Sequence, residues 1–515
     1  MGARSFNSNN RTIETLTFQT NSDSGSTFNP TINKSVGRVS WDMGDNGGYY
    51  IASNNPNYTY NDNGTLKTVK VRSNNIGDVT LISSSGNNIV GHLDASKSGE
   101  LTGFLVRLNP ELTGITNTYS SKSLSTYDVR SNDLLGTLDL SMFQQFTSQF
   151  FVQSNNNLKR IIHTACTKSM TFYYAFQCDI TGEHDVSMFT NIGPRFSMYQ
   201  NSSLTAVTHS YSNSNFNQYY IDQCDITGTH DVSMFPNLGG EVSLNSNSNL
   251  NKVIHTASTQ TFTRYHINSC DIIGNHDLSM FPNLGGTLLF SSNSNLTGIT
   301  HTYSPQVITY YASSNCDITG NHDVSMFPNL GGTFTVADNP NLTSVTHTAS
   351  TQTFSNYYIN DCNITGTHDV SMLTSLGGSF RCYNNSNLTD ILFPHTTETF
   401  LNTLNSLGFY AFAMYNCGLG YVNFLPLSSS TMDVNSPQDC TIDLSSNGMT
   451  TTEVNHILVD FDNLSTNLNP SGWSGVTLDI GGTNATPDTT SGGYNGIAAI
   501  DSLTGITNNW SITTS

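Results

Sequence analysis

Short alternations of apolar and polar positions recur along most of the chain. Val242 and Leu244 flank one polar position, and Asn247 follows three residues after Leu244. Tyr265, 23 residues after Val242, starts the same pattern, which this time ends at Cys270. Because successive side chains of a strand point to opposite faces, each apolar pair predicts a short strand with one buried face. The Asn or Cys that follows predicts an inward-turned residue at a bend.

The pattern belongs to a long internal repeat. The block CDITGTHDVSMFPNLGG begins at Cys224 and returns with few changes every 46 residues. Its other copies begin at Cys178, Cys270, Cys316 and Cys362. A fixed period of this length is typical of solenoids, in which each repeat contacts only its neighbours. We expect a solenoid with paired coils of about 23 residues, an α/β fold dominated by β structure, and one parallel sheet.

An inward column of Asn and Cys side chains is expected to run along the stack. Asn side chains there can bond the backbone of the next coil, whose polar groups must be satisfied once buried. The expected structural ladder consists of Asn155, Cys178, Asn201, Cys224, Asn247, Cys270, Asn293, Cys316, Asn339 and Cys362.

The cysteines of this column are expected to stay reduced. Two neighbours in the column lie two coils apart, roughly 10 Å, whereas a disulfide needs Cα atoms within about 7 Å. Cys166, Cys382 and Cys440 lie off the column and form no evident pair. We therefore expect buried, inert thiols.

The two ends of the chain differ from its middle. Residues 1–62 alternate like strands with Gly and Asn turns, which predicts an N-terminal β cap or attachment region. Residues 63–449 form the repeat solenoid, with about nine extra residues near 393–408. Residues 450–515 predict a C-terminal α/β cap that covers the last core layer.

The C-terminal region contains an amphipathic helix signal. Val454, Ile457 and Phe461 make an apolar stripe at helical spacing. Thr451 or Thr452 is expected to cap this helix. A strand, a short helix and a final strand are expected to follow.

The low content of charged residues and the negative net charge argue against some classes of partner. Only 11% of the residues are charged, and the net charge is −19 with 18 Lys and Arg. Nucleic acid is a poor partner for such a surface, because phosphate binding needs basic patches. No apolar run approaches the ~18 residues of a membrane span, so no membrane insertion is expected. The first ten residues lack the apolar segment of a secretory signal, so we expect a removed signal or release by another route.

Histidines form two columns with the period of the repeat. The first column is His184, His230, His276, His322 and His368, each followed by Asp. The second column is His163, His209, His255, His301 and His347. Three interpretations are open: the histidines fill the wall opposite the sheet, sense pH, or bind a metal.

No enzyme motif is present. The chain has no G-x-S-x-G elbow and no Gly-rich phosphate loop. The repeated Asp after each His is typical of a turn residue, whereas catalytic carboxylate pairs are normally placed once. We expect a protein that is not an enzyme and holds no cofactor.

The coil pattern L-x-L-x-x-N-x-x-L resembles the leucine-rich-repeat family. The D-I-T-G-x-H-D-V-S-M-F-P-N-L-G-G coils, the N-S-N-L-T turns and the T-T-E-V-N-H-I-L-V-D-F-D-N tail look like leucine-rich-repeat proteins of bacteriophages and prophages, often among tail or fibre genes. This resemblance implies a virion surface protein for host attachment, a tail fibre or receptor-binding protein. Its expected partners are a host cell-surface glycan or protein receptor and, through the N-terminal region, other virion proteins; an oligomer is compatible. The alternatives are a bacterial cell-surface or secreted adhesin, a glycan-acting enzyme, and an ice binder.

The candidate receptor-binding face is the outer side of the sheet. A residue between two inward apolar positions must point to solvent. Exposed tyrosines offer an apolar ring and a hydroxyl, which suits a sugar or protein receptor. They could also simply cover the sheet or pack against a partner subunit. The candidate residues are Tyr174, Tyr220, His266, Tyr358, Tyr199, Arg381 and Tyr383.

Overall fold

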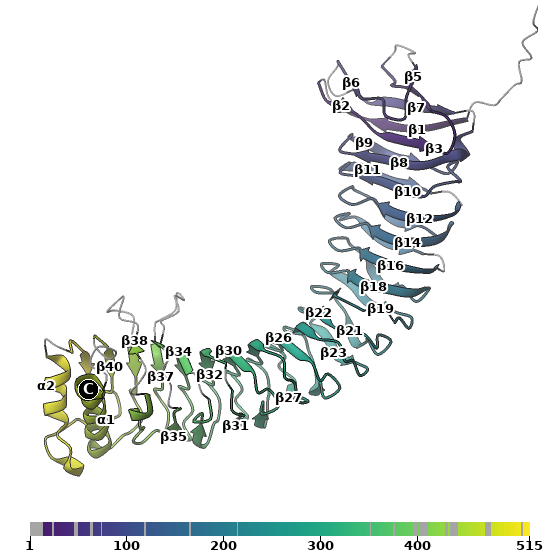
Figure 1. Ribbon diagram of the computed structural model, residues 1–515. Coiled ribbons are helices and arrows are strands. Elements are labelled where there is room, and N and C mark those ends of the chain that lie inside the picture. The colour runs from purple at the N-terminus through teal and green to yellow at the C-terminus, as the bar shows by residue number, and fades with distance from the viewer. Residues whose placement is uncertain are drawn as a thin grey trace, which may run out of the picture. The chain divides into compact units, whose positions relative to one another are not determined.

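A computed structural model gives the fold of the chain (Figure 1). It describes residues 14–22, 25–45, 50–61, 65–73, 75–117, 120–163, 166–213, 215–350, 352–373, 376–394, 399–400, 410–427, 431–432, 441–468, 475–505 and 508–514. The chain divides into two compact units, and each is described by itself. Unit 1 comprises Met1–Leu250 with Ile254–Thr256, and unit 2 comprises Asn251–Val253 with Ala257–Ser515.

Unit 1 begins with an antiparallel sheet. β1 (Glu14–Thr20) pairs with β7 (Lys67–Ser73), and β7 pairs in turn with β4 (Ser40–Asp42). Trp41 on β4 is fully buried beneath this sheet. The antiparallel pairing thus continues past the expected boundary at residue 62.

Shorter elements complete this region. They are β2 (Thr27–Phe28), β5 (Tyr50–Ala52), β6 (Tyr58–Thr59), β9 (Ile89–Asp94), β11 (Glu111–Thr116) and the 3-10 turn η1 (Ile76–Asp78). On one side β9 pairs with β1 in antiparallel fashion, and on the other side it pairs with β11 in parallel. The change from antiparallel to parallel pairing marks the start of the repeats.

The rest of unit 1 is a β-solenoid built on a parallel sheet. Its strands are β8 (Val79–Ser85), β10 (Gly103–Arg107), β12 (Ser120–Asp128), β14 (Phe143–Phe151), β16 (Cys166–Tyr174), β18 (Phe189–Ser197), β20 (Gln218–Tyr220) and β22 (Gly240–Ser243). β3 (Thr31–Lys34) closes its first edge in antiparallel pairing with β8. Tyr173 lies opposite Phe196, which lies opposite Tyr219, so inward side chains stack in register from coil to coil.

Unit 2 has the same design of parallel main strands. Its strands are β24 (Phe262–His266), β26 (Leu284–Leu289), β28 (Ile308–Ala312), β30 (Leu330–Thr335), β32 (Phe354–Tyr358), β34 (Leu376–Arg381), β37 (Tyr410–Ala413), β39 (Thr441–Asp443), β40 (Thr477–Asp479) and β41 (Ser511–Thr513). Most of the expected insertion at 393–408 lies outside the described residues. The solenoid and its long parallel sheet agree with the sequence-based prediction.

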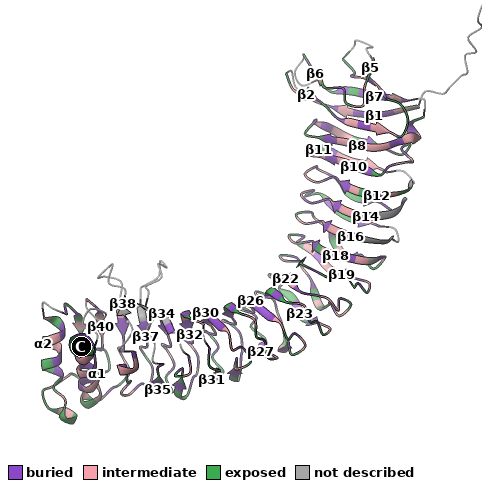
Figure 2. Cartoon of the chain, in the orientation of Figure 1, coloured by how far each residue is buried: buried purple, intermediate pink, exposed green. Residues whose placement is uncertain are grey.

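In each unit a second wall lies opposite the main-sheet strands, and it consists of short strands, which the sequence did not predict. The strands of the second wall are β13 (Gly136–Asp139), β15 (Leu158–Ile162), β17 (Thr181–Asp185), β19 (Ser203–Thr208), β21 (Thr227–Asp231), β23 (Asn249–Ile254), β25 (Gly274–Asp277), β27 (Leu296–Thr300), β29 (Gly320–Asp323), β31 (Leu342–Thr346), β33 (Gly366–Asp369) and β35 (Leu388–Leu392). These strands pair only two by two, as in β25 with β27 and β29 with β31. β36 (Thr399–Phe400) and β38 (Thr431–Met432) form a separate parallel pair, and β36 lies against β34 of the main sheet. Figure 2 shows that buried residues follow both walls.

Asparagine side chains tie neighbouring coils together at the bend after each main strand. The Asn201 amide, fully buried, donates to the carbonyls of Ala175 and Met198 at 2.8 and 2.7 Å. Its oxygen accepts from the backbone N–H of Ile180 at 3.1 Å. At alternate coils a thiol replaces the amide, and Cys178 Sγ donates to the Val152 carbonyl at 3.3 Å. Each side chain therefore satisfies backbone groups that the stacking buries.

Cysteine labelling is expected to be slow in the native protein. Cys224 and Cys316 are 7% and 6% exposed, and burial raises their pKa to about 12 and about 11. Few thiolates therefore exist at neutral pH, and the thiolate is the reactive form. Labelling with a thiol reagent, followed by peptide mapping, should modify both only after denaturation. Rapid native labelling of Cys224 would contradict the placement.

Cys382 is buried and free, as expected, but it has a thiol neighbour that the sequence did not predict. It faces Cys417 of the adjacent coil, whose Sγ donates to the Cys382 carbonyl at 3.1 Å. The neighbouring thiol lowers the pKa of Cys417, while burial raises that of Cys382. The side chain of Cys166 and all of Cys440 lie outside the described structure.

Two α-helices occur among the described residues, both near the C-terminus. α1 (Thr451–Asn463) buries its apolar stripe, and α2 (Gly496–Thr504) follows it. Thr450, one residue before the expected position, caps α1, because its side chain accepts from the Glu453 N–H while Glu453 bonds back. This is a capping box, whose reciprocal bonds need a threonine three residues before the glutamate.

The remaining helical turns are short. They are η2 (Leu425–Leu427), η3 (Leu464–Leu468) and η4 (Ser491–Gly493). η3 continues α1 in a wider turn, and Leu464 there is buried. No described helix is long and apolar enough to cross a membrane.

Candidate functional site

The outer face of the main sheet carries side chains that alternate with the core. On β16, Tyr173 points inward and is fully buried, while its neighbours Phe172 and Tyr174 stay partly exposed. Phe176, two residues further, is also partly exposed. The sequence FYYAF thus places three aromatic rings on one side, because a strand has a period of two residues.

In unit 1 these rings form a continuous cluster, the unit-1 platform, which consists of Phe151, Phe172, Tyr174, Phe176 and Tyr199. The Phe151 and Tyr174 ring centroids are 5.4 Å apart, and Tyr174 and Phe176 are 5.8 Å apart. Phe176 and Tyr199 stack at 4.4 Å with an angle of 10° between their planes. Three neighbouring coils supply the five rings.

Arginines border the unit-1 platform. The Arg130 guanidinium lies 5.4 Å from the Phe151 ring centroid, and Arg195 lies 5.4 Å from that of Phe172. Arg130 and Arg107 both bind the Asp128 carboxylate at 3.2 Å. Burial raises the pKa of Asp128, and the two arginines oppose that effect. Arg130 and Arg195 therefore lie over aromatic rings, and neither is buried.

Unit 2 has a smaller cluster of the same kind, the unit-2 platform, which consists of Tyr358, Arg381, Tyr383 and Tyr415. The Arg381 guanidinium lies 4.6 Å from the Tyr358 ring centroid. Tyr383 and Tyr415 stack at 4.7 Å with planes 3° apart. Burial, and secondarily the Asp361 carboxylate, raises the pKa of Tyr383, so the phenol stays neutral and can donate a hydrogen bond.

Two candidate residues lie apart from the platforms. Tyr220 is partly exposed on β20, opposite Ser243 of the next strand. His266 bonds the Thr287 hydroxyl at 2.7 Å, and burial, with the Arg264 charge second, lowers its pKa to about 4. His266 is therefore a neutral imidazole near pH 7.

Strand alternation also places Ser197 and Ser243 at outward positions and predicts that they are exposed, which is wrong. Each is only 4% exposed. Ser197 lies opposite Tyr174 in the sheet, within the region of the unit-1 platform. Large rings on neighbouring coils cover small side chains between them, and single-strand alternation does not predict that.

Sequence reasoning missed half of the rings. Phe151, Phe172, Phe176 and Tyr415 occupy outward positions next to the predicted tyrosines. The signal was present in the two-residue spacing of Phe172, Tyr174 and Phe176. The stacking of Tyr383 on Tyr415 had no such signal, because 32 residues separate them.

The histidine columns lie inside the solenoid rather than on the face. Tyr219 is fully buried, and its hydroxyl bonds His209 Nε2 at 2.6 Å and His230 Nε2 at 2.8 Å. We call each such set a His–Tyr–His bridge. The bridges are His163–Tyr173–His184, His209–Tyr219–His230, His301–Tyr311–His322 and His347–Tyr357–His368, and Tyr265 bonds His276 in the same way. The histidines of these bridges therefore lie where the first of the three interpretations places them, in the wall opposite the sheet.

Burial holds these imidazoles neutral. It lowers the pKa of His184, His230 and His322 to about 4, and that of His347 to about 3. The adjacent Asp231 points outward, where its carboxylate accepts from the Ser233 N–H at 2.8 Å. Within the described ranges, no group of three or more His, Cys, Asp or Glu side chains could hold a metal ion.

Comparison with protein-family models and with curated proteins finds no match to this chain. The platforms themselves therefore carry the functional argument. They can offer aromatic faces, phenol donors and guanidinium groups to a ligand that lies along the sheet.

Proposed function

We propose that this protein is a non-enzymatic recognition protein that binds a carbohydrate receptor on a cell surface through the outer face of its main sheet. The observation that carries this proposal is the row of partly exposed rings from Tyr174 through Phe176 to Tyr199. An aromatic face provides apolar contact for the C–H side of a sugar ring, while its neighbours can bond the hydroxyls.

Polar side chains suited to hydroxyl groups lie beside the rings. The Ser154 hydroxyl donates to Gln177 Oε1 at 3.1 Å, and the Gln200 amide donates to Gln223 Oε1 at 2.9 Å. Gln177, Gln200 and Gln223 are exposed and follow one another at 23-residue intervals. A row of amides next to a row of rings supports an extended glycan chain rather than a single small molecule.

The resemblance to leucine-rich-repeat proteins of bacteriophages supports a place on a virion. In this proposal the paired coils are leucine-rich-repeat-like, and the protein acts as a tail fibre or receptor-binding protein. The N-terminal antiparallel sheet attaches it to other virion proteins. α1 and α2 cover the last coil, consistent with the contact of Phe461 on α1 with Phe424 and Trp510 at 4.7 and 5.4 Å.

Removal of the unit-1 platform is expected to weaken attachment. The combined variant Tyr174→Ser, Phe176→Ser and Tyr199→Ser should attach to susceptible bacterial cells at least about tenfold less, since each ring is worth about 1 kcal/mol and 1.4 kcal/mol is tenfold. Pull-down of purified protein on a panel of bacterial strains measures this.

The control variant is Tyr303→Ser, because Tyr303 is 58% exposed and belongs to neither platform. It should attach like the unchanged protein. Full attachment by the folded triple variant would remove the unit-1 platform from the proposal, and the same substitution at Tyr358 and Tyr383 would then test the unit-2 platform.

A further inference from the structure

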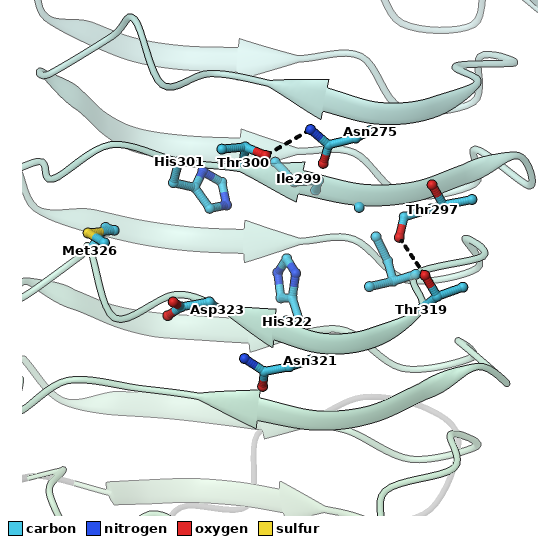
Figure 3. Close-up of a pocket in the computed structure, with 12 residues that line it drawn as sticks. Asn275, Thr297, Ile299, Thr300, His301, Thr319, Asn321, His322, Asp323 and Met326 are labelled. Carbon is cyan, nitrogen blue, oxygen red and sulfur yellow. Dashed lines mark hydrogen bonds between the residues drawn. The ribbon is translucent and has the colours of Figure 1, made fainter.

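A groove opens on the second wall of unit 2, away from the main sheet. β27 pairs with β25 and β29 pairs with β31, whereas β27 and β29 form no ladder with each other. They still touch where the Thr319 N–H donates to the Thr297 carbonyl at 3.0 Å. Gly320 then turns the chain with a φ of 69°, and a cavity of about 450 Å³ remains between the two strands (Figure 3).

Two imidazoles lie at the base of this groove. The Tyr311 hydroxyl bonds His301 Nε2 at 3.0 Å and His322 Nε2 at 2.7 Å. A hydroxyl has one proton, so it donates to one ring and accepts from the other. His322 makes no other hydrogen bond within the described structure. Its Nδ1 can therefore donate or accept one hydrogen bond to a ligand in the groove.

The rim combines hydroxyl and amide groups with an apolar side chain. The Asn275 amide donates to the Thr300 hydroxyl at 2.8 Å, and the Asn321 oxygen accepts from Ser344 and Thr346. The Asn321 amide hydrogens make no bond to described residues. Met326 is 40% exposed at the edge. Figure 3 shows Thr300, Asn321 and Met326 around the two imidazoles.

We propose that this groove binds one pyranose ring of a saccharide. Hydroxyl groups both donate and accept, which matches the mixed amide, hydroxyl and imidazole groups of the groove. The thioether and the Ile299 side chain offer apolar contact to the C–H side of the ring. The cavity has the size of small-molecule sites, about 300–1,000 Å³. A neutral sugar fits better than an anion, because the Asp323 carboxylate is also part of the lining.

This site is separate from the platforms on the main sheet. It lies on the opposite wall, and it uses no platform residue. Burial lowers the pKa of His322 to about 4, so its imidazole is neutral near pH 7. Because the groove and the platforms share no residue, a variant of one site leaves the other site unchanged.

The test is a sugar titration of the full chain with methyl-labelled methionine, followed by NMR. D-glucose, D-galactose and N-acetyl-D-glucosamine are added separately, and the Met326 methyl signal is assigned with the variant Met326→Leu. At least one sugar should shift the Met326 signal in a saturable manner. Met142 is the internal control, because it is 44% exposed in a coil where Asn117 and Leu138 replace the two histidines. Its signal should stay unchanged.

Variants test whether the Met326 shift arises from binding in the groove. Thr300→Trp fills the groove and should abolish the Met326 shift, whereas Thr309→Trp, at an exposed position on β28, should leave it intact. The platform variant Tyr174→Ser, Phe176→Ser, Tyr199→Ser should also keep it. No saturable Met326 shift with any of the three sugars, or a shift that persists in folded Thr300→Trp, would overturn the proposal.

Discussion

Mild acid is expected to destabilise the repeats that contain His–Tyr–His bridges. The pKa of His184, His230 and His322 is about 4 in the folded chain, against about 6.5 for an unfolded histidine. Below about pH 6.5 these histidines bind protons in the unfolded chain but not in the folded chain, so the free energy of unfolding falls as the pH falls. At pH 5 each such imidazole should cost about 2 kcal/mol, and the loss levels off below about pH 4.

Thermal unfolding at about pH 7.5, 6 and 5, followed by circular dichroism, measures this effect. Several bridges act together, so the midpoint should fall steeply between pH 6.5 and 5, before most carboxylates titrate. The chain's net charge of −19 at pH 7 works the other way, since acid reduces self-repulsion. An unchanged midpoint at pH 5 would contradict the buried neutral histidines.

The chain provides its own control for this prediction. In an earlier coil the Tyr127 hydroxyl bonds Asn117 at 3.3 Å, and Leu138 stands where later coils have histidine. The double variant His163→Asn, His184→Leu copies that arrangement around Tyr173. It should fold and lose less stability in acid than the unchanged protein does.

Loss of one rung of the asparagine ladder is expected to have the second large effect. Asn201→Leu leaves two carbonyls and one N–H, all buried, without the amide that now bonds them. Each of the three unsatisfied groups costs about 1–3 kcal/mol, so the coil should lose about 3–9 kcal/mol. Hydrogen exchange read by mass spectrometry should show faster exchange near Ile180 and Met198 and little change in distant coils, because repeats contact only neighbours.

Asn201→Cys is the matched variant. A thiol at the equivalent position of the previous coil, Cys178, donates to the Val152 carbonyl at 3.3 Å. Cysteine should therefore keep part of the stabilisation, and its exchange should lie between that of the unchanged protein and Asn201→Leu. Equal exchange in all three proteins would show that the ladder contributes nothing.

The repeat itself made much of this fold predictable. A 46-residue period and the two-residue spacing of apolar positions lead directly to stacked parallel strands, because both are local properties of the chain. The helical stripe of Val454, Ile457 and Phe461 is equally local, and α1 lies where it predicts. A wall opposite the sheet was expected, but its strands were missed, since short GNHD-type segments have no apolar alternation of their own.

The candidate site depends on contacts between coils, which sequence alone gives less well. Tyr174 lies against Phe151 and Phe176, and Ser197 lies opposite Tyr174 on the next strand, so the exposure of both depends on contacts between coils. The two histidine columns were evident in the sequence, but the His–Tyr–His bridges were not. Tyr219, which bonds both histidines, was predicted only as an inward strand position. Such contacts require the register between coils, which the structure provides.

The most direct test of recognition by the outer sheet face is hydroxyl-radical footprinting of the full chain. The protein is oxidised with and without surface polysaccharide purified from cells to which it attaches. Oxidation of Tyr174, Phe176 and Tyr199 should decrease when the polysaccharide is present, while oxidation of Tyr303 should stay unchanged. Unchanged oxidation of all three rings in the presence of bound polysaccharide would contradict recognition by this face.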